Sequence, residues 1–369
     1  MKQFSYAGLL LLFFLFLAGC KKNDQVLLKE FKQVNLVANT NAYHALRVDP
    51  TLQNAWGLAF NPTGVPWVNA QAGHVSEIYD KEGNILRAPV NIPSPTGATG
   101  GSPTGIVFNS SNDFMLENKQ KAAFLFVGDD GILSGWNPAA GNNALLIKNN
   151  AATSSYTGLA EGSSEGKSFL YGANFKTGKI DVWNARFEPQ TMPFKDPGLP
   201  AGYAPFNIQN IEGWLYVAYA KVGPGGDEEH GSGLGLVSIF NTDGSFVKRF
   251  ASNDSLNAPW GLTKAPASFF EDVHDCGLGN AHGHGGGSSA QPQPAILIGS
   301  LGDGHINAYS LDGNFLGQLK SGNDVITIEG LWALSFPPAA ATSIDPNRLY
   351  FTAGPQDEKD GLFGYIIKQ

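Results

Sequence analysis

One pattern occurs six times along the chain, at intervals of roughly 50 residues. Each copy begins with a short apolar segment, continues with a second apolar segment and a glycine turn, and ends with a segment in which apolar and polar residues alternate. The six copies open at residues 55–60, 103–108, 156–160, 205–209, 259–263 and 331–336. A repeat of this length, built from about four short strands, is typical of a β-propeller, in which every copy forms one radial blade. The sequence therefore predicts an all-β fold, a six-bladed β-propeller.

The last copy lacks a fourth strand. Its apolar segments lie at residues 348–352 and 362–367, and the sequence stops two residues later. An alternating segment at residues 31–37 precedes the first copy and belongs to none of the six. Because an unpaired sheet edge promotes aggregation, we expect this N-terminal strand to complete the last blade and close the ring.

The first 20 residues have the pattern of an export signal. Lys2 precedes an apolar run at residues 6–17, which is too short to span a bilayer with room for flanking residues. The segment ends in Leu17-Ala18-Gly19-Cys20, small residues before a cysteine, which resembles the cleavage site of a bacterial lipoprotein. An ordinary cleaved signal is the alternative.

This pattern predicts a lipoprotein signal peptide at residues 1–19, acylation of Cys20, a polar tether at residues 20–30 and the propeller at residues 31–369. Each buried methylene of an acyl chain contributes about 0.8 kcal/mol of membrane binding. We therefore expect the protein to be exported and held by its N-terminal lipid on the bacterial cell envelope, at the outer membrane.

The charge balance limits the possible partners. The chain has 24 lysine and arginine residues against 32 aspartate and glutamate residues, a net charge of −8. Nucleic-acid-binding proteins need a basic surface, so the charge argues against a nucleic-acid partner. With Cys20 acylated, Cys276 is the only remaining thiol, and no intrachain disulfide is expected.

The loops that precede the first strand of each blade share one face of a propeller with the loops between the second and third strands. Aromatic and polar side chains around the mouth of a central channel resemble a ligand-binding site. The residues expected there are the ring-opening Trp56, Thr104, Thr157, Phe206, Trp260 and Trp332, the strand-end Asp129, Asp303 and Asp357, and also Gln71 and the loop 226–230. The alternatives are that the tryptophans pack neighbouring blades and that the aspartates satisfy local turns.

Two groups of residues are candidates for binding a divalent cation, calcium or zinc. The strand-end aspartates offer carboxylate oxygens, which calcium prefers. A glycine-rich insertion at residues 270–294 contains His274, Cys276, His282 and His284, whose imidazole and thiolate groups are zinc ligands. The insertion follows the first strand of the fifth blade, so it should project from the opposite face. A surface insertion that binds no metal is the alternative.

Three strings of the sequence resemble a known family. They lie at residues 54–60, 302–309 and 349–364, and the resemblance extends from about Val34 to the C-terminus. They are similar to an uncharacterised family of exported bacterial β-propeller proteins, which is distantly like the NHL and gluconolactonase-type propellers. The resemblance implies the propeller fold and carries no activity.

The sequence favours a binding function over catalysis and leaves the enzyme class open. We expect a scaffold that binds an envelope protein or a glycan through the face carrying Trp56, Trp260 and Trp332. The alternative is a metal-dependent lactone or ester hydrolase of the gluconolactonase-like type, with a cation on the axis. Such a cation needs several charged oxygens, whereas the six ring positions contain no acid and Glu329 is the nearest one.

Overall fold

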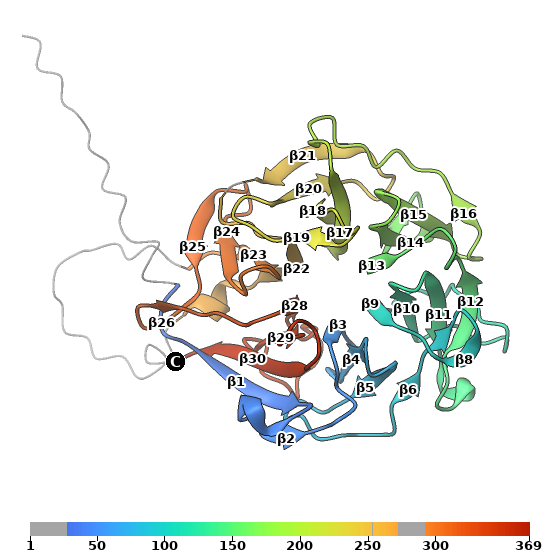
Figure 1. The fold of residues 1–369 in the computed structure, drawn as a ribbon, viewed down its shortest axis with the longest axis horizontal. Helices are drawn as coiled ribbons and strands as arrows, with labels where there is room; N and C mark the ends of the chain where they lie inside the picture. Colours follow the sequence, from blue (N-terminus) through green and yellow to red (C-terminus); the bar gives the residue numbers. More distant parts are fainter. Residues whose placement is uncertain (1–27, 253, 272–291) are drawn as a thin grey trace, which may run out of the picture.

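The computed structural model describes residues 28–252, 254–271 and 292–369, and Figure 1 shows their sheets arranged radially around a central axis. Six sheets of four or five strands form the ring. Within the described ranges the only helices are three short 3-10 turns, at Asn41–Tyr43, Pro138–Ala140 and Ala267–Phe270. The structure therefore confirms the six-bladed β-propeller. No helix in these ranges is long and apolar enough to cross a bilayer.

Blades 1 to 5 are antiparallel sheets whose first strands lie nearest the axis and contact one another around it. Their strands are, for blade 1, β3 (Ala55–Phe60), β4 (Pro66–Ala70), β5 (Val75–Ile78) and β6 (Val90–Asn91); for blade 2, β9 (Pro103–Phe108), β10 (Phe124–Gly128), β11 (Ile132–Trp136) and β12 (Leu145–Asn149); for blade 3, β13 (Tyr156–Ser164), β14 (Lys167–Asn174), β15 (Lys179–Asn184) and β16 (Pro189–Gln190); for blade 4, β17 (Tyr203–Ile211), β18 (Trp214–Val222), β20 (Gly235–Phe240) and β21 (Phe246–Ala251); and for blade 5, β22 (Pro259–Ala265), β23 (Ala295–Ser300), β24 (Ile306–Tyr309) and β25 (Phe315–Gln318).

Short additional strands extend this framework. In blade 4, β19 (Glu228–Glu229) pairs with the end of β18. Two separate hairpins are formed by β7 (Pro93–Ser94) with β8 (Gly97–Gly100), and by β26 (Lys320–Ser321) with β27 (Asp324–Val325).

Blade 6 joins the two ends of the described chain. It contains β28 (Leu331–Ser335), β29 (Leu349–Ala353) and β30 (Leu362–Lys368), and its fourth strand is β1 (Phe31–Ala38), with β2 (Arg47–Val48) added in parallel. The antiparallel register of β1 and β30 runs from the pair Phe31 and Lys368 to the pair Ala38 and Leu362. The expected closure by the N-terminal strand is therefore confirmed.

The burial pattern explains why these segments form blades. Every residue of β10, β23 and β29 is buried, because a middle strand has its own sheet on both edges and other blades on both faces. Near the axis, side chains also hydrogen-bond to the backbone of the next blade. These contacts are Asn69 to Thr104 O, Thr104 to Tyr156 O, Asn207 to Trp260 O and Thr352 to Trp56 O. Such polar bonds help to fix the positions of neighbouring blades at four of the six junctions.

Several sequence-based predictions lie outside the described residues. The predicted signal peptide, Cys20 and most of the tether fall within residues 1–27. His274, Cys276, His282 and His284 fall within residues 272–291. These remain predictions.

Candidate functional site

Four of the six ring-opening residues meet at the centre of the ring. Trp56 and Trp332 stack with their ring centroids 3.6 Å apart, and Trp260 contacts both edge-on, at 6.5 and 5.9 Å. Phe206 packs against Trp332, with ring centroids 5.8 Å apart. Trp332 and Phe206 are 0% exposed, and the other two are 5% exposed. We call these four residues the aromatic plug, because their contacts are those of a packed core.

The two threonines of the ring have different surroundings. Thr104 is fully buried, and its hydroxyl bonds to Tyr156 O at 2.6 Å and Val127 O at 3.1 Å. Its role is therefore to join blades 2 and 3. Thr157 faces a cavity, and its carbonyl accepts the indole N–H of Trp260 at 2.9 Å.

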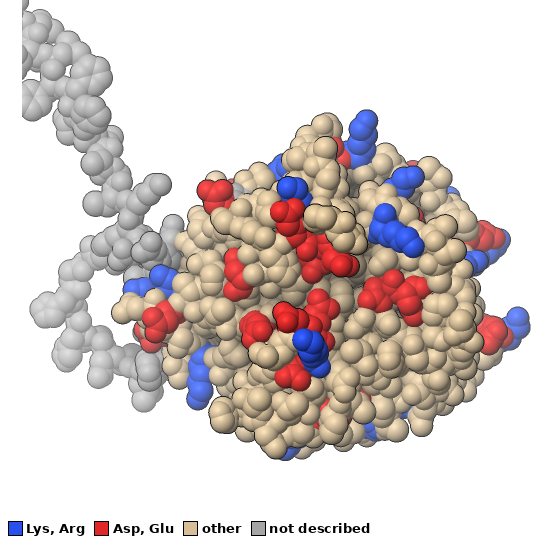
Figure 2. Space-filling model, viewed as in Figure 1, with Lys and Arg blue, Asp and Glu red and all other residues tan. Residues whose placement is uncertain are grey.

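A cavity of about 810 Å³ opens beside the aromatic plug. Its lining comes from loops that precede first strands or that connect second and third strands, as expected for one face of the ring. We call it the acidic cavity, and it is lined by Trp56, Asp129, Ser155, Thr157, Phe175, Lys176, Thr177, Gly178, Gly202, Tyr203, Ala204, Val222, Gly225, Gly226, Asp227, Glu228 and Glu358. Figure 2 shows aspartate and glutamate side chains gathered around the axis on this face.

A chain of amide groups connects the plug to two carboxyl groups of the cavity. Trp332 donates its indole N–H to Asn54 Oδ1 at 2.9 Å, which turns the amide nitrogen of Asn54 toward Glu358 Oε2 (2.8 Å) and Gln71 Oε1 (3.2 Å). Gln71 Nε2 then donates to Asp129 Oδ2 at 2.7 Å. Both carboxyl groups therefore accept N–H bonds, an arrangement that suits their ionised form.

Within the described ranges, the charge of these two groups is not offset by an ion pair with a lysine or an arginine. Burial raises the pKa of Asp129 to about 6, and burial together with the carboxyl groups of Glu228, Asp129 and Asp227 raises the pKa of Glu358 to about 7. The site thus holds two half-buried carboxyl groups with neutral hydrogen-bond donors, and a basic group that interacts with Glu358 is the imidazole of His230, whose pKa is raised by hydrogen bonding to Glu228 and also by the carboxyl group of Glu358.

A left-handed turn brings Glu358 into the cavity. Gln356, Asp357 and Glu358 have φ values of 58°, 52° and 64°, a conformation that costs an L-residue about 1–2 kcal/mol. The backbone N–H of Gln356 donates to Glu329 Oε1 at 3.0 Å, and the N–H of Glu358 donates to Gly354 O at 3.1 Å. Strain of this kind often occurs at binding sites, where the surrounding structure maintains it.

The same turn directs Asp357 away from the site. Its side chain is 96% exposed and lies 3.8 Å from Lys359. Glu358 lines the cavity, whereas Asp357, the neighbouring residue expected from the sequence, does not. No sequence signal identifies Glu358, because three consecutive left-handed residues without glycine are rare.

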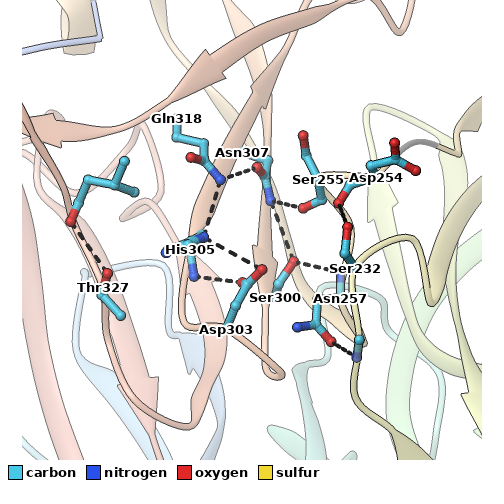
Figure 3. Close-up of polar contacts among 12 residues, drawn as sticks. Ser232, Asp254, Ser255, Asn257, Ser300, Asp303, His305, Asn307, Gln318 and Thr327 are labelled. Atoms are coloured by element: carbon cyan, nitrogen blue, oxygen red, sulfur yellow. Dashed lines mark hydrogen bonds and ion pairs between the residues drawn. The ribbon is translucent and has the colours of Figure 1, made fainter.

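Asp303 lies in the hairpin between β23 and β24, and Figure 3 shows its contacts. Asp303 Oδ1 accepts the backbone N–H of His305 at 3.1 Å, and its Oδ2 lies 3.5 Å from His305 Nδ1. The same ring nitrogen contacts Gln318 Nε2 at 3.2 Å, and Gln318 also donates to Asn307 Oδ1 at 3.1 Å. Asp303 therefore satisfies local groups and does not line the cavity.

The three predicted aspartates do not converge on one point, since only Asp129 lies in the cavity. Among the residues that the structure describes, no group of three or more histidine, cysteine, aspartate or glutamate side chains is arranged to hold a metal ion. The candidate site is therefore a cavity lined in part by the indole ring of Trp56, with more carboxyl groups than ammonium groups in its lining.

Comparison with known proteins identifies relatives. No family model matches the chain. It is 30% identical over 348 residues to uncharacterized protein R648 of Acanthamoeba polyphaga mimivirus, with 91% of this chain and 80% of that protein aligned. The chain belongs to the family of that protein. Uncharacterized protein L690 of the same virus is 29% identical over 347 residues, with 90% and 84% aligned. These relatives are viral, so they do not support the bacterial, exported family expected from the sequence strings.

Two solved structures share the fold at low sequence identity. One is a catalytically inactive virginiamycin B lyase from Staphylococcus aureus with quinupristin, at 10% identity and a TM-score of 0.50, covering 91% of this chain and 98% of that one. The other is an auxiliary nutrient binding protein from Bacteroides ovatus, also at 10% identity and a TM-score of 0.50, covering 85% and 70%. At this identity the likeness extends to the propeller fold alone.

Proposed function

We propose that this propeller is a binding protein whose ligand enters the acidic cavity. The observation that carries the proposal is the pair Asp129 and Glu358, two half-buried carboxyl groups that share one amide network and form no ion pair with a lysine or arginine among the described residues. The cavity volume of about 810 Å³ falls within the range of roughly 300–1,000 Å³ typical of small-molecule sites. A ligand there would contact loops of five blades held by a rigid ring.

From the sequence we expect the ligand to be a glycan or an envelope protein. Hydroxyl-rich molecules suit a lining in which carboxyl, hydroxyl and backbone groups alternate with Trp56, Phe175 and Tyr203. The alternative function, a metal-dependent lactone or ester hydrolase, would require three or more ligands around one cation. Four carboxyl groups line the cavity, but no three metal-ligating side chains among the described residues are grouped to hold an ion, so these residues support binding better.

We further propose that the protein is held on the cell envelope, at the outer membrane, by lipid on Cys20. The support is the segment Leu17-Ala18-Gly19-Cys20. Only ten residues separate Cys20 from Phe31, the first residue of β1, so the tether spans at most about 40 Å. A Cys20→Ala protein should move from the membrane fraction to the soluble fraction, and mass spectrometry should find no acyl chain on it. An acylated wild-type peptide is the matched control.

Hydrogen–deuterium exchange tests where ligands bind. The probes are a panel of neutral, acidic and basic oligosaccharides, each added in excess to the full chain. Binding in the acidic cavity should slow exchange in the segments 175–178, 225–228 and 356–358, each of which contributes at least one residue to the lining. Protection confined to the opposite face of the ring, or protection by none of the probes, would contradict the proposed function.

A further inference from the structure

A buried pair of carboxyl groups lies at the junction of blades 1 and 6. Glu77 belongs to β5 and is 1% exposed, and Asp49 follows β2 and is 7% exposed. Neither residue lines the acidic cavity. The hydroxyl group of Thr51 lies between them, with its Oγ1 2.6 Å from Asp49 Oδ1 and 2.5 Å from Glu77 Oε1. Both distances are those of hydrogen bonds.

The hydroxyl group of Thr51 fixes the number of protons in this cluster. A hydroxyl group has one hydrogen, so Thr51 can donate to only one of the two carboxyl groups. The other short contact is a hydrogen bond only if that carboxyl group carries a proton of its own and donates it to Thr51 Oγ1. The geometry therefore requires one protonated carboxyl group in the pair.

The remaining hydrogen bonds assign this proton to Glu77. Asp49 accepts the hydroxyl of Tyr79 at Oδ2 (2.8 Å) and the backbone N–H of Thr51 at Oδ1 (3.1 Å), which suits an ionised carboxylate. Among the residues that the structure describes, Thr51 is the only hydrogen-bond partner of the Glu77 side chain. Burial raises the pKa of Glu77 from 4.5 to about 7, the bond with Thr51 lowers it, and the carboxyl group of Asp49 raises it. The hydrogen bonds thus run from Glu77 through Thr51 to Asp49.

The surroundings of the pair contain no compensating cation. Within the described ranges, no lysine, arginine or histidine forms an ion pair with Asp49 or Glu77. Side chains alternate along β5, so Glu77 shares a face with Tyr79, whose own pKa is raised well above its usual value by burial and by the two carboxyl groups. Blade 6 packs against Tyr79 with Tyr350, whose hydroxyl donates to a backbone carbonyl at 3.1 Å, and with the apolar Leu36, Val37 and Phe363. A second negative charge here would be buried and unpaired.

The segment 49–54, which connects β2 with β3, links this pair to the acidic cavity. The backbone N–H of Asp49 donates to the last residue of β1 at 2.9 Å. Three residues after Thr51, Asn54 carries the amide group that bonds to the aromatic plug and to Glu358. Thr51 itself is exposed, so a displacement of this turn would admit water to Glu77.

We propose that Glu77 carries a proton in the folded protein and acts as a pH-sensitive switch, whose deprotonation loosens the segment 49–54. Loss of the proton leaves two carboxylates with one hydroxyl hydrogen between them, so one bond breaks and repulsion favours a conformation in which water reaches the pair. Because Asn54 lies in the same segment, the amide network of the acidic cavity loosens with it. This switch is a property of the chain alone and does not rest on the proposed binding function.

Hydrogen–deuterium exchange of the full chain at pH 6 and pH 8.5, corrected for the intrinsic exchange rate at each pH, tests the switch. The closed segment holds the proton of Glu77 up to a pH of about 7, whereas an opened segment releases it near 4.5, so residues 49–54 should open about tenfold more often at pH 8.5. Strand β23 is buried throughout and reports global unfolding. Residues 49–54 should open more often than β23 at both pH values, which identifies a local opening.

Two pairs of variants assign the switch to its residues. Glu77→Gln is neutral at every pH and its amide can donate to Thr51 Oγ1, so it should reduce the tenfold increase to less than about threefold. Glu358→Gln removes another glutamate whose pKa is raised to about 7, and it should keep the increase. Thr51→Ser retains the hydroxyl group and should behave like the wild type, whereas Thr51→Val removes it and should increase the opening already at pH 6. Circular dichroism checks that each variant is folded.

Each result either supports or overturns the switch. Equal opening of residues 49–54 at the two pH values in the wild type, or opening no more frequent than that of β23, would overturn it without any variant. An increase that persists in Glu77→Gln, or that disappears in Glu358→Gln, would assign the titration to another group. Unchanged exchange of Thr51→Val at pH 6 would remove the hydroxyl bridge. No ligand takes part, so these failures would leave the proposed binding function intact.

Discussion

The two ends of the axial channel are made by the same six first strands, yet they differ in character. The acidic cavity occupies about 810 Å³ at one end, whereas the other end holds a cavity of about 300 Å³ lined mainly by apolar side chains, including Leu58, Ile106 and Phe336. Each end has a half-buried glutamate whose pKa is raised by burial. At Glu161 hydrogen bonds from Ser110 and Ser111 and, to a smaller extent, the ammonium group of Lys121 oppose this rise, while at Glu358 further carboxyl groups increase it. The comparison teaches that burial alone does not mark a binding site, because the hydrogen-bond donors and charges around the buried group also act on it.

Deleting β1 should have the largest effect. It tests whether the acidic cavity and the smaller cavity at the other end of the axis both depend on a closed ring. Without β1, strand β30 becomes an exposed edge and Phe31 no longer packs on Phe269, 4.9 Å away between ring centroids. We expect loss of the cooperative unfolding transition and of exchange protection at both ends. Circular dichroism melting of the chain lacking residues 31–38 checks this. A melting temperature equal to that of the wild type would show that the ring does not need its fourth strand in blade 6.

Removing the ring of Trp332 should affect the two ends unequally. Trp332→Ala leaves a hole in the aromatic plug and frees Asn54, and it should lower the free energy of unfolding by about 3–5 kcal/mol. Trp332→Phe keeps a ring and loses only the N–H, so its loss should be smaller. Phe336→Ala at the apolar end, where the ring is only partly buried, is the matched comparison. Urea unfolding measures all three, and a larger loss for Phe336→Ala would contradict the plug as the main axial contact.

The pH dependence of stability should distinguish Glu358 from Glu161. The pKa of Glu358 is raised from 4.5 to about 7 in the folded protein, so the folded state holds its proton more tightly than the unfolded chain. Its contribution is complete below pH 4.5 and is lost as the pH rises through 7. This loss amounts to at most about 3 kcal/mol, and to less where solvent screens the charge.

Glu358→Gln should therefore flatten the decline in the free energy of unfolding between pH 4.5 and 8, and Glu161→Gln should flatten it less. Urea unfolding at several pH values gives both slopes. The groups that interact with Glu358 are Asp129 from the loop after β10, and Asp227, Glu228 and His230 from the segment between β18 and β20. Equal slopes for the two variants would remove the electrostatic distinction between the two ends.

The smallest effect is expected at the exposed member of the left-handed turn. Asp357→Asn should change the free energy of unfolding by less than about 0.5 kcal/mol, because the side chain is 96% exposed and its contact with Lys359 is a surface ion pair. Chemical unfolding at neutral pH measures the change. A loss of 1 kcal/mol or more would place Asp357 in the structural support of the cavity.

Most of the fold was accessible from the sequence, because each blade is a local unit whose strands follow one another. The face assignment depended on the same regularity, and the lining of the acidic cavity includes Trp56, Thr157, Asp129 and residues 226–228 of the expected loop. The packing across the axis was not accessible. Aromatic residues at ring positions do not reveal whether their rings meet, and here Phe206 and Trp332 are completely buried in the plug. Glu358 was missed because its position depends on an unusual backbone conformation.

Blade 6 is built from both ends of the described chain, so these two ends lie on neighbouring strands of one sheet. Phe31 and Lys368 are directly opposite each other on β1 and β30, so their Cα atoms are about 5 Å apart. A short peptide could join these positions, and the chain could then be reopened in an exposed loop between two other blades. The molecule is therefore suited to circular permutation, which would move the termini around the ring while leaving every sheet intact.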